Sequence, residues 1–226
     1  MTEREAILAR VREGLSVEAP MPGHHGLHAT ELKDARNTFR QWLPQVGESV
    51  DDQIAAFRTA SDALKTDFRL VENEAAAHAT LKEIAATEGW TKIASHRHEL
   101  IDPAVTALGL ESIQTDAGYD VNAMEKCDAG ISGCDALVAQ MGSVLVTSRS
   151  AGGRALSVLP PHHVVLARRE QLVPDLTAAL QLVKQKYATN YPSFIGFITG
   201  PSRTGDIERI LVLGAHGPKK LTVICW

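Results

Sequence analysis

Residues 194–213 read FIGFITGPSRTGDIERILVL, and this segment contains the patterns that decide the fold. The segment begins with a short apolar run over 194–199, which is typical of a buried strand. The loop GPSRTGD follows, and the apolar spacing of IERILVL then predicts a helix over 205–213. A strand that leads through a glycine-containing loop into a helix is the repeating unit of parallel α/β proteins.

The same alternation extends back to residue 68. Short apolar runs predict strands, and segments with helical spacing lie between them. The strands are expected at 68–71, 90–95, 136–138, 143–147, 163–167 and 221–225, and the helices at 73–88, 102–108 and 173–187. This order predicts an α/β protein with a mostly parallel sheet and flanking helices on both faces.

The first 67 residues have a different texture, rich in charge and poor in β-branched residues. Helices are expected at 2–15, 29–43 and 50–67, with a loop rich in Pro, Gly and His over 20–28. Thr2 and Glu5 have the spacing of a capping box. We therefore expect an N-terminal helical arm or cap over 1–67 and an α/β domain over 68–226.

The composition excludes several classes of protein. The chain has 226 residues, 44% of them hydrophobic, which suffices for a globular core. The net charge of −4 is spread along the chain, which argues against nucleic acid as a partner. No apolar run approaches the ~20 residues of a membrane span. The charged start lacks an export signal, and the three cysteines form no CxxC pair, so we expect a cytoplasmic protein.

The GPSRTGD loop is a candidate anion site. The first turn of a helix presents unpaired N–H groups and a partial positive charge. Its candidate ligand-binding residues are Gly200, Pro201, Ser202, Arg203, Thr204 and Asp206. The arginine fork suits a carboxylate or phosphate. The alternative is that the hydroxyls and the carboxylate only cap a helix.

A histidine loop, Gly214-Ala215-His216-Gly217-Pro218, follows the predicted helix. A continuous helix would place His216 about 12–15 Å from the GPSRT loop. His216 is then either an ordinary loop residue or a group that reaches the site of a neighbouring protomer.

Two further segments are candidates for lining the site. Gly142 would allow close backbone approach, and Ser143 opens a strand. Ser143 does not lie in a GxSxG elbow, so no serine nucleophile is expected. Pro160 and His163 lie where a rigid proline pair enters the strand over 163–167.

Metal and cofactor patterns are weak. The three histidines of the Pro/Gly/His-rich loop and the pair Cys127 and Cys134 lack the spacing of a zinc site. The chain also has no GxGxxG fingerprint, no P-loop and no iron–sulfur cysteine pattern. We therefore expect neither a metal nor a redox cofactor in this chain.

Three segments together resemble the lactate-utilisation protein C family, also called the LUD domain family. They are DAGISGCDALVAQMGSVLV at 128–146, SVLPPHHVVL at 157–166 and ITGPSRTGDIERILVLGAHGPKKLTVI at 198–224. The resemblance implies a NagB/RpiA/CoA-transferase-like fold. It also implies a role in oxidising L-lactate to pyruvate beside two partner proteins whose iron–sulfur clusters carry the electrons. The family's motif positions fall on Gly200–Thr204 and Asp206, on Gly214 and His216–Pro218, and on Pro160 and His163.

One position departs from that family. Relatives often carry glutamate where this chain has Gln140. The glutamate nucleophile of CoA transferases is therefore weakly supported here. Three functions stay open: a non-redox subunit that binds a small anionic ligand, a free-standing enzyme on a sugar phosphate or CoA ester, and a non-catalytic scaffold. Each is compatible with a homo-oligomer.

Overall fold

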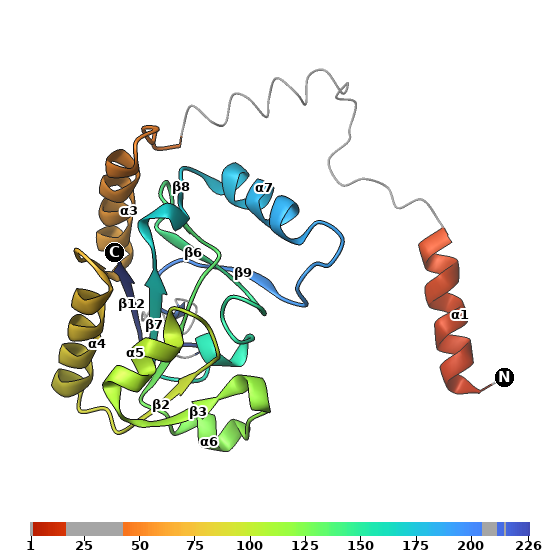
Figure 1. The fold of residues 1–226 in the computed structure, drawn as a ribbon. Helices are drawn as coiled ribbons and strands as arrows, with labels where there is room; N and C mark the ends of the chain where they lie inside the picture. Colours follow the sequence, from red (N-terminus) through yellow and green to blue (C-terminus); the bar gives the residue numbers. More distant parts are fainter. Residues whose placement is uncertain (1, 17–42, 205–211, 215) are drawn as a thin grey trace. The chain divides into compact units, whose positions relative to one another are not determined.

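The computed structural model describes residues 2–16, 43–204, 212–214 and 216–226 (Figure 1). The chain divides into two units, Met1–Pro44 and Gln45–Trp226. In the first unit, α1 (Glu3–Ser16) confirms the predicted N-terminal helix. Its capping box is present, since the Thr2 N–H donates to Glu5 Oε2 at 2.8 Å and the Glu5 N–H to Thr2 Oγ1 at 3.4 Å. The predicted loop over 20–28 and the helix over 29–43, up to residue 42, lie outside the described residues.

The second unit is built on a six-stranded sheet in which every neighbouring pair is parallel. Its strand order is β1-β12-β7-β4-β2-β3. The strands are β1 (Asp67–Leu70), β2 (Lys92–Ser95), β3 (Glu111–Gln114), β4 (Ala129–Ser132), β7 (His162–Ala167) and β12 (Lys220–Cys225). This main sheet confirms the predicted α/β class.

Alternate side chains of the central strands enter two separate cores, because successive residues of a strand point to opposite faces. Val164 and Leu166 of β7 pack against α4 (Glu74–Glu88) and α5 (Ile101–Leu108). Val165 and Ala167 enter a core on the other face. Both faces are therefore covered, and this explains why β7 is buried along its whole length.

A second, four-stranded sheet packs on that other face, in the order β8-β5-β6-β9. Its strands are β5 (Ala136–Val138), β6 (Ser143–Thr147), β8 (Leu172–Val173) and β9 (Ile195–Ile198). The pairs β5–β6 and β6–β9 are antiparallel. The sequence predicted three of these strands but assigned them to the parallel sheet. The short link between β5 and β6 rules this out, since a parallel connection needs a dozen or more residues.

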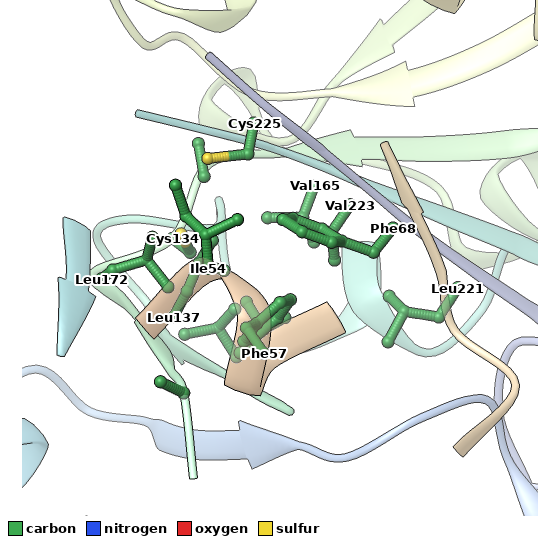
Figure 2. Close-up of a cluster of buried hydrophobic side chains, with 14 of the residues drawn as sticks. Ile54, Phe57, Phe68, Cys134, Leu137, Val165, Leu172, Leu221, Val223 and Cys225 are labelled. Atoms are coloured by element: carbon green, nitrogen blue, oxygen red, sulfur yellow. The ribbon is translucent and has the colours of Figure 1, made fainter. Parts of the chain in front are cut away.

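Two helices flank the second sheet. On its outer side, α7 (Leu176–Tyr187) packs Ala179, Val183 and Tyr187 against Ala136, Val138 and Leu145. On the side of the main sheet, α3 (Val50–Leu64) inserts Ile54 and Phe57 into the shared core (Figure 2). The helix α3 lies within the unit Gln45–Trp226, although the sequence grouped it with the N-terminal arm.

Short elements complete the unit. They are α6 (Val121–Glu125), the 3-10 turns Thr115–Ala117, Ala155–Ser157 and Arg169–Gln171, and a small hairpin of β10 (Arg203–Thr204) and β11 (Val212–Leu213). No described helix is both long and apolar enough to cross a membrane.

The start of α4 offers a test of the local structure. Asn73 Oδ1 accepts a hydrogen bond of 3.0 Å from the Ala76 N–H, the usual N-cap contact. We expect Asn73→Ala to lower the free energy of unfolding by about 1 kcal/mol, because this N–H loses its partner. Urea denaturation of this variant and of the exposed neighbour Glu72→Ala measures the difference. An equal loss in both variants would contradict a capping role.

Candidate functional site

The GPSRT loop at 200–204 lies side by side with the described residues of the histidine loop, Gly214 and 216–218. The Ser202 N–H donates to the Pro218 carbonyl at 2.9 Å, and the Gly214 N–H donates to the Ser202 carbonyl at 2.9 Å. Arg203 pairs with Leu213 in the β10–β11 hairpin. The predicted helix is therefore wrong at 212–213, while residues 205–211 and 215 lie outside the described residues. The predicted separation of the two loops is wrong as well, because the chain returns as a strand.

The loop opens on a cavity of about 460 Å³ at the amino ends of β1, β12 and β7, which we call the amino-edge cavity. Pro201 and Arg203 line it, together with groups from the start of β12 and from α4. In open α/β sheets ligands usually bind at the opposite edge, at the carboxyl ends of the strands. The strand before this loop, β9, belongs to the second sheet, and its carboxyl end delivers the loop to the amino edge of the main sheet.

Positive charge exceeds negative charge in the amino-edge cavity. Its lining includes five cations, Lys65, Arg69, Arg203, Lys219 and Lys220, and three acids, Asp67, Glu83 and Glu88. Two of the acids are already paired. Lys220 Nζ lies 2.6 Å from both oxygens of Glu88, and Arg69 Nε lies 2.9 Å from Asp67 Oδ2.

The remaining cations have no acidic partner in the described part of the chain. They are Lys65, Arg203 and Lys219. Lys65 follows α3 in the left-handed conformation, with its N–H bonded to the Asp62 carbonyl at 3.2 Å. Lys219 is anchored through its N–H to the Pro161 carbonyl at 2.8 Å. Hydrogen bonds therefore fix the main chain of both lysines beside the cavity.

His162, the first residue of β7, forms part of the wall. Its Nε2 lies 2.9 Å from Thr222 Oγ1, and its ring meets Trp90 edge-on at 5.2 Å. Its Nδ1 is buried and has no hydrogen-bond partner among the described residues. Burial lowers the pKa of His162 to about 4, so the ring is neutral at pH 7. His162 therefore forms an uncharged part of the wall beside the cations.

The other predicted site residues mostly pack the scaffold. Gly142 and Gly200 both have positive φ and lie against α3, close to Ala60 and Leu64 respectively. Ser143 is buried, with its Oγ 2.8 Å from Thr199 Oγ1. None of these residues lines the amino-edge cavity.

Pro160 and His163 lie behind the wall. Pro160 is buried near Gly130, where an added Cβ would also meet the Leu156 carbonyl. His163 is buried, with its Nε2 2.8 Å from Ser132 Oγ, and burial lowers its pKa to about 3. Adjacent residues of β7 face opposite ways, so His162 rather than His163 reaches the cavity.

The remaining candidate residues belong to the GPSRTGD loop and the histidine loop. Ser202 is half-buried beside Gly217, and His216 is exposed and does not line the cavity. Thr204 pairs with Val212 in the hairpin. Asp206 lies outside the described residues.

The described residues contain no group of three His, Cys, Asp or Glu side chains that could hold a metal ion. His24, His25 and His28 lie outside them. Cys127 and Cys134 are both buried, and burial raises the pKa of each thiol. Cys127 lies in the cluster with Met124 and Leu156, whereas Cys134 lies in the core beside the second sheet.

Of the groups that line the amino-edge cavity, sequence reasoning found Pro201 and Arg203 and missed the others, among them Lys65, His162 and Lys219. The alternation along the strand could have selected His162 over His163. Lys65 and Lys219 could not have been found from the pattern, because they belong to segments that only the strand order β1-β12-β7 brings together.

Comparison with known proteins shows to which family the chain is related. The model of the LUD domain matches residues 54–225. Lactate utilization protein C of Geobacillus thermodenitrificans (strain NG80-2) is 29% identical over 202 residues, covering 81% of this chain and 82% of that protein. The protein of the same name from Bacillus subtilis (strain 168) is 27% identical over 202 residues, with the same coverage.

A solved structure shows a similar fold. The crystal structure of a DUF162 family protein from Deinococcus radiodurans superimposes with a TM-score of 0.61 at 19% identity, covering 79% of this chain and 99% of that one. With the domain model matching most of the chain, the resemblance seen in the sequence is confirmed. The chain belongs to the LUD domain family.

Proposed function

We propose that this chain is a subunit of a lactate-utilisation system, in which it binds a small anionic ligand in the amino-edge cavity. The names of its relatives support the system. Three cations around a cavity of about 460 Å³ support the binding of an anion, since Lys65, Arg203 and Lys219 form no ion pair with a described residue. A guanidinium and two ammonium groups match a carboxylate or a phosphate.

The proposal gives this chain a binding role rather than an electron-carrying one. Its sequence contains no pattern for a redox cofactor. In the proposed system, partner proteins with iron–sulfur clusters accept the electrons of lactate oxidation, and this chain presents or senses the anion. We also propose that the system works in the cytoplasm, because all three cysteines are free thiols.

The variant Arg203→Gln tests whether an anion binds in the amino-edge cavity. We expect it to weaken binding at least about tenfold, because a charge-assisted hydrogen bond contributes ~1.5–3 kcal/mol. The ring resonances of His162 in ¹H–¹³C NMR spectra report on this cavity during titration with L-lactate, pyruvate or inorganic phosphate. The matched control is Lys184→Gln, which removes one exposed cation from α7 outside the cavity.

Saturable shifts of His162 that weaken in Arg203→Gln, but not in Lys184→Gln, would support the proposal. Unchanged affinity in Arg203→Gln would contradict the proposed role of Arg203, and the absence of saturable His162 shifts with all three probes would favour the scaffold hypothesis. Turnover of a CoA ester or sugar phosphate by the purified chain alone would favour the free-standing enzyme.

A genetic experiment tests the system. We expect deletion of the gene to abolish growth on L-lactate but not on glucose, and the intact gene to restore it. Affinity-tagged chain from the same cells should co-purify proteins with the absorbance of iron–sulfur clusters. Normal growth of the deletion strain on L-lactate would rule out an essential role in this system.

A further inference from the structure

A second group of polar side chains lies at the opposite, carboxyl edge of the main sheet. The neighbouring strands β2 and β4 are parallel there, but the chain leaves them in different directions. From β2 it continues through α5 to β3 at the edge of the sheet, whereas from β4 it enters β5 of the second sheet. Such a divergence opens a crevice at the carboxyl ends of the strands, where ligands bind in open α/β sheets.

Loops from both sheets meet at this crevice. A Cβ on Gly133, just after β4, would lie 3.1 Å from the Ser150 carbonyl and 3.4 Å from Cε1 of His98. The loops after β2, β4 and β6 are therefore in contact. With the end of α7 they form an open cavity of about 310 Å³, lined by His98, Arg149, Ser150, Lys186 and Tyr187. We call it the carboxyl-edge cavity.

No carboxylate lines this cavity among the described residues, and both of its strong bases face it. Arg149 has no carboxylate partner in the described part of the chain, and its guanidinium lies over the Tyr187 ring at 5.4 Å. His98 accepts the Leu100 N–H on Nδ1 at 3.2 Å, which leaves Nε2 to carry the proton of the neutral ring.

A buried carboxylate holds the second base in place. Asp135 Oδ1 accepts hydrogen bonds from Lys186 Nζ at 2.7 Å and from the Tyr187 hydroxyl at 2.6 Å. The Asp135 side chain is fully buried, and its Oδ2 has no hydrogen-bond partner among the described residues. An ion pair under the floor of a cavity, with one oxygen unused, holds the lysine in position without occupying its other two N–H donors.

The charge state of Lys186 excludes a nucleophilic amine. Burial, the largest single influence, would lower the pKa of Lys186, but the hydrogen bond to Asp135 and the attraction of its negative charge together outweigh burial and raise the pKa above its usual value. The lysine therefore stays protonated at neutral pH and acts as a cation. Beside Arg149 it leaves the carboxyl-edge cavity with a net positive charge, since Asp135 balances only one of the two bases.

We propose that the carboxyl-edge cavity is a second binding site for a small oxyanion, a carboxylate or a phosphate, which Arg149, Lys186 and His98 hold. Its volume suits a small metabolite rather than a polymer. This site is independent of the amino-edge cavity, because the two lie at opposite ends of the parallel strands and share no lining residue.

Histidine ring spectra test the two sites separately. In ¹H–¹³C spectra of the full chain, His98 reports on the carboxyl-edge cavity and His162 on the amino-edge cavity. L-lactate, pyruvate and inorganic phosphate serve as probes in separate titrations. We expect at least one probe to shift His98 saturably, and Arg149→Gln to weaken that binding at least about tenfold.

Controls separate lost binding from lost folding. Arg203→Gln should leave the His98 titration unchanged, and Arg149→Gln should keep its melting temperature within a few degrees. Absence of saturable His98 shifts with all three probes would overturn the proposal. Equal affinity of His98 in Arg149→Gln and in the unmodified chain would overturn it too. Shifts of His162 alone would leave the proposed function standing and remove only this second site.

Discussion

Lowering the pH from 7.5 to 5 is expected to reduce the free energy of unfolding by about 4 kcal/mol, through two buried histidines alone. Burial holds the pKa of His162 at about 4 and that of His163 at about 3. In the unfolded chain both rings return to a value near 6.5. His96 adds to the effect, since burial lowers its pKa as well.

The sign follows from where the protons bind. Between pH 6.5 and the lowered pKa values, the unfolded chain takes up protons that the folded chain refuses, so acid favours unfolding. A pH of 5 lies about 1.5 units below the pKa of each ring in the unfolded chain, which corresponds to a loss of about 2 kcal/mol of stability per histidine. Acids such as Glu88 and Asp135 have lowered pKa values and lose their stabilising contribution only at lower pH, from about 4.5 and 3.8 downward.

Urea denaturation at several pH values measures this slope. The variant His163→Gln removes one titrating ring, and its amide can still reach Ser132, the partner of the native ring at 2.8 Å. We expect its stability to be lower at pH 7.5 but to fall by about 2 kcal/mol less on acidification. His216→Gln, at an exposed loop position, should keep the full slope. A stability that does not change between pH 7.5 and 5 would refute the assignment.

Phe57→Ala is expected to cost about 3–5 kcal/mol of stability, the range for removing a fully buried aromatic ring. Phe57 has no exposed surface and meets Phe68 edge-on at 4.9 Å. Figure 2 shows it on α3 between the side chains of the two sheets, with Leu137 on one side and Leu221 on the other. Its removal would leave a cavity where three layers join.

The matched control is Val50→Ala on the same helix, where the valine is 49% exposed. That change should remain within about 0.5 kcal/mol of the unmodified chain. Thermal and urea denaturation of both variants give the comparison. A loss below about 1 kcal/mol for Phe57→Ala would show that α3 does not pack as described.

The parallel sheet was predictable because its central strands are buried on both faces and are therefore written as apolar runs, such as HHVVLA in β7. The strand β4 was missed, since its AGIS sequence contains a glycine and a serine. There the glycine is required by the close approach of the Leu156 carbonyl, a tertiary contact that no local pattern records. The second sheet was not predicted as a separate sheet, because the tendency of a segment to form a strand does not tell which other strand it pairs with.

The candidate site was predictable only in part. Arg203 and Pro201 were found because a loop that ends an apolar strand is a common place for ligands. The helix expected after that loop was wrong at Val212–Leu213, where apolar spacing alone could not distinguish a helix from a returning strand. Arg149 lies in the basic segment RSAGGR at 149–154, whose sequence fits either a loop that closes over an anion or an ordinary turn, and Lys186 lies in the helix predicted at 173–187. Their common cavity depends on the packing of the second sheet and α7.

The central place of β12 has a consequence for how the molecule forms. This strand lies between β1 and β7, and Thr222 faces Asp67 from 155 residues away along the chain. Until the ribosome has made residues 220–225, β1 and β7 have no strand between them in the sheet. Both edges then expose unpaired backbone groups and apolar side chains, which favours association with other chains. Completion of the sheet must therefore wait for the C-terminal strand to be inserted, and we expect nascent chains that stall before residue 220 to depend on chaperones for solubility.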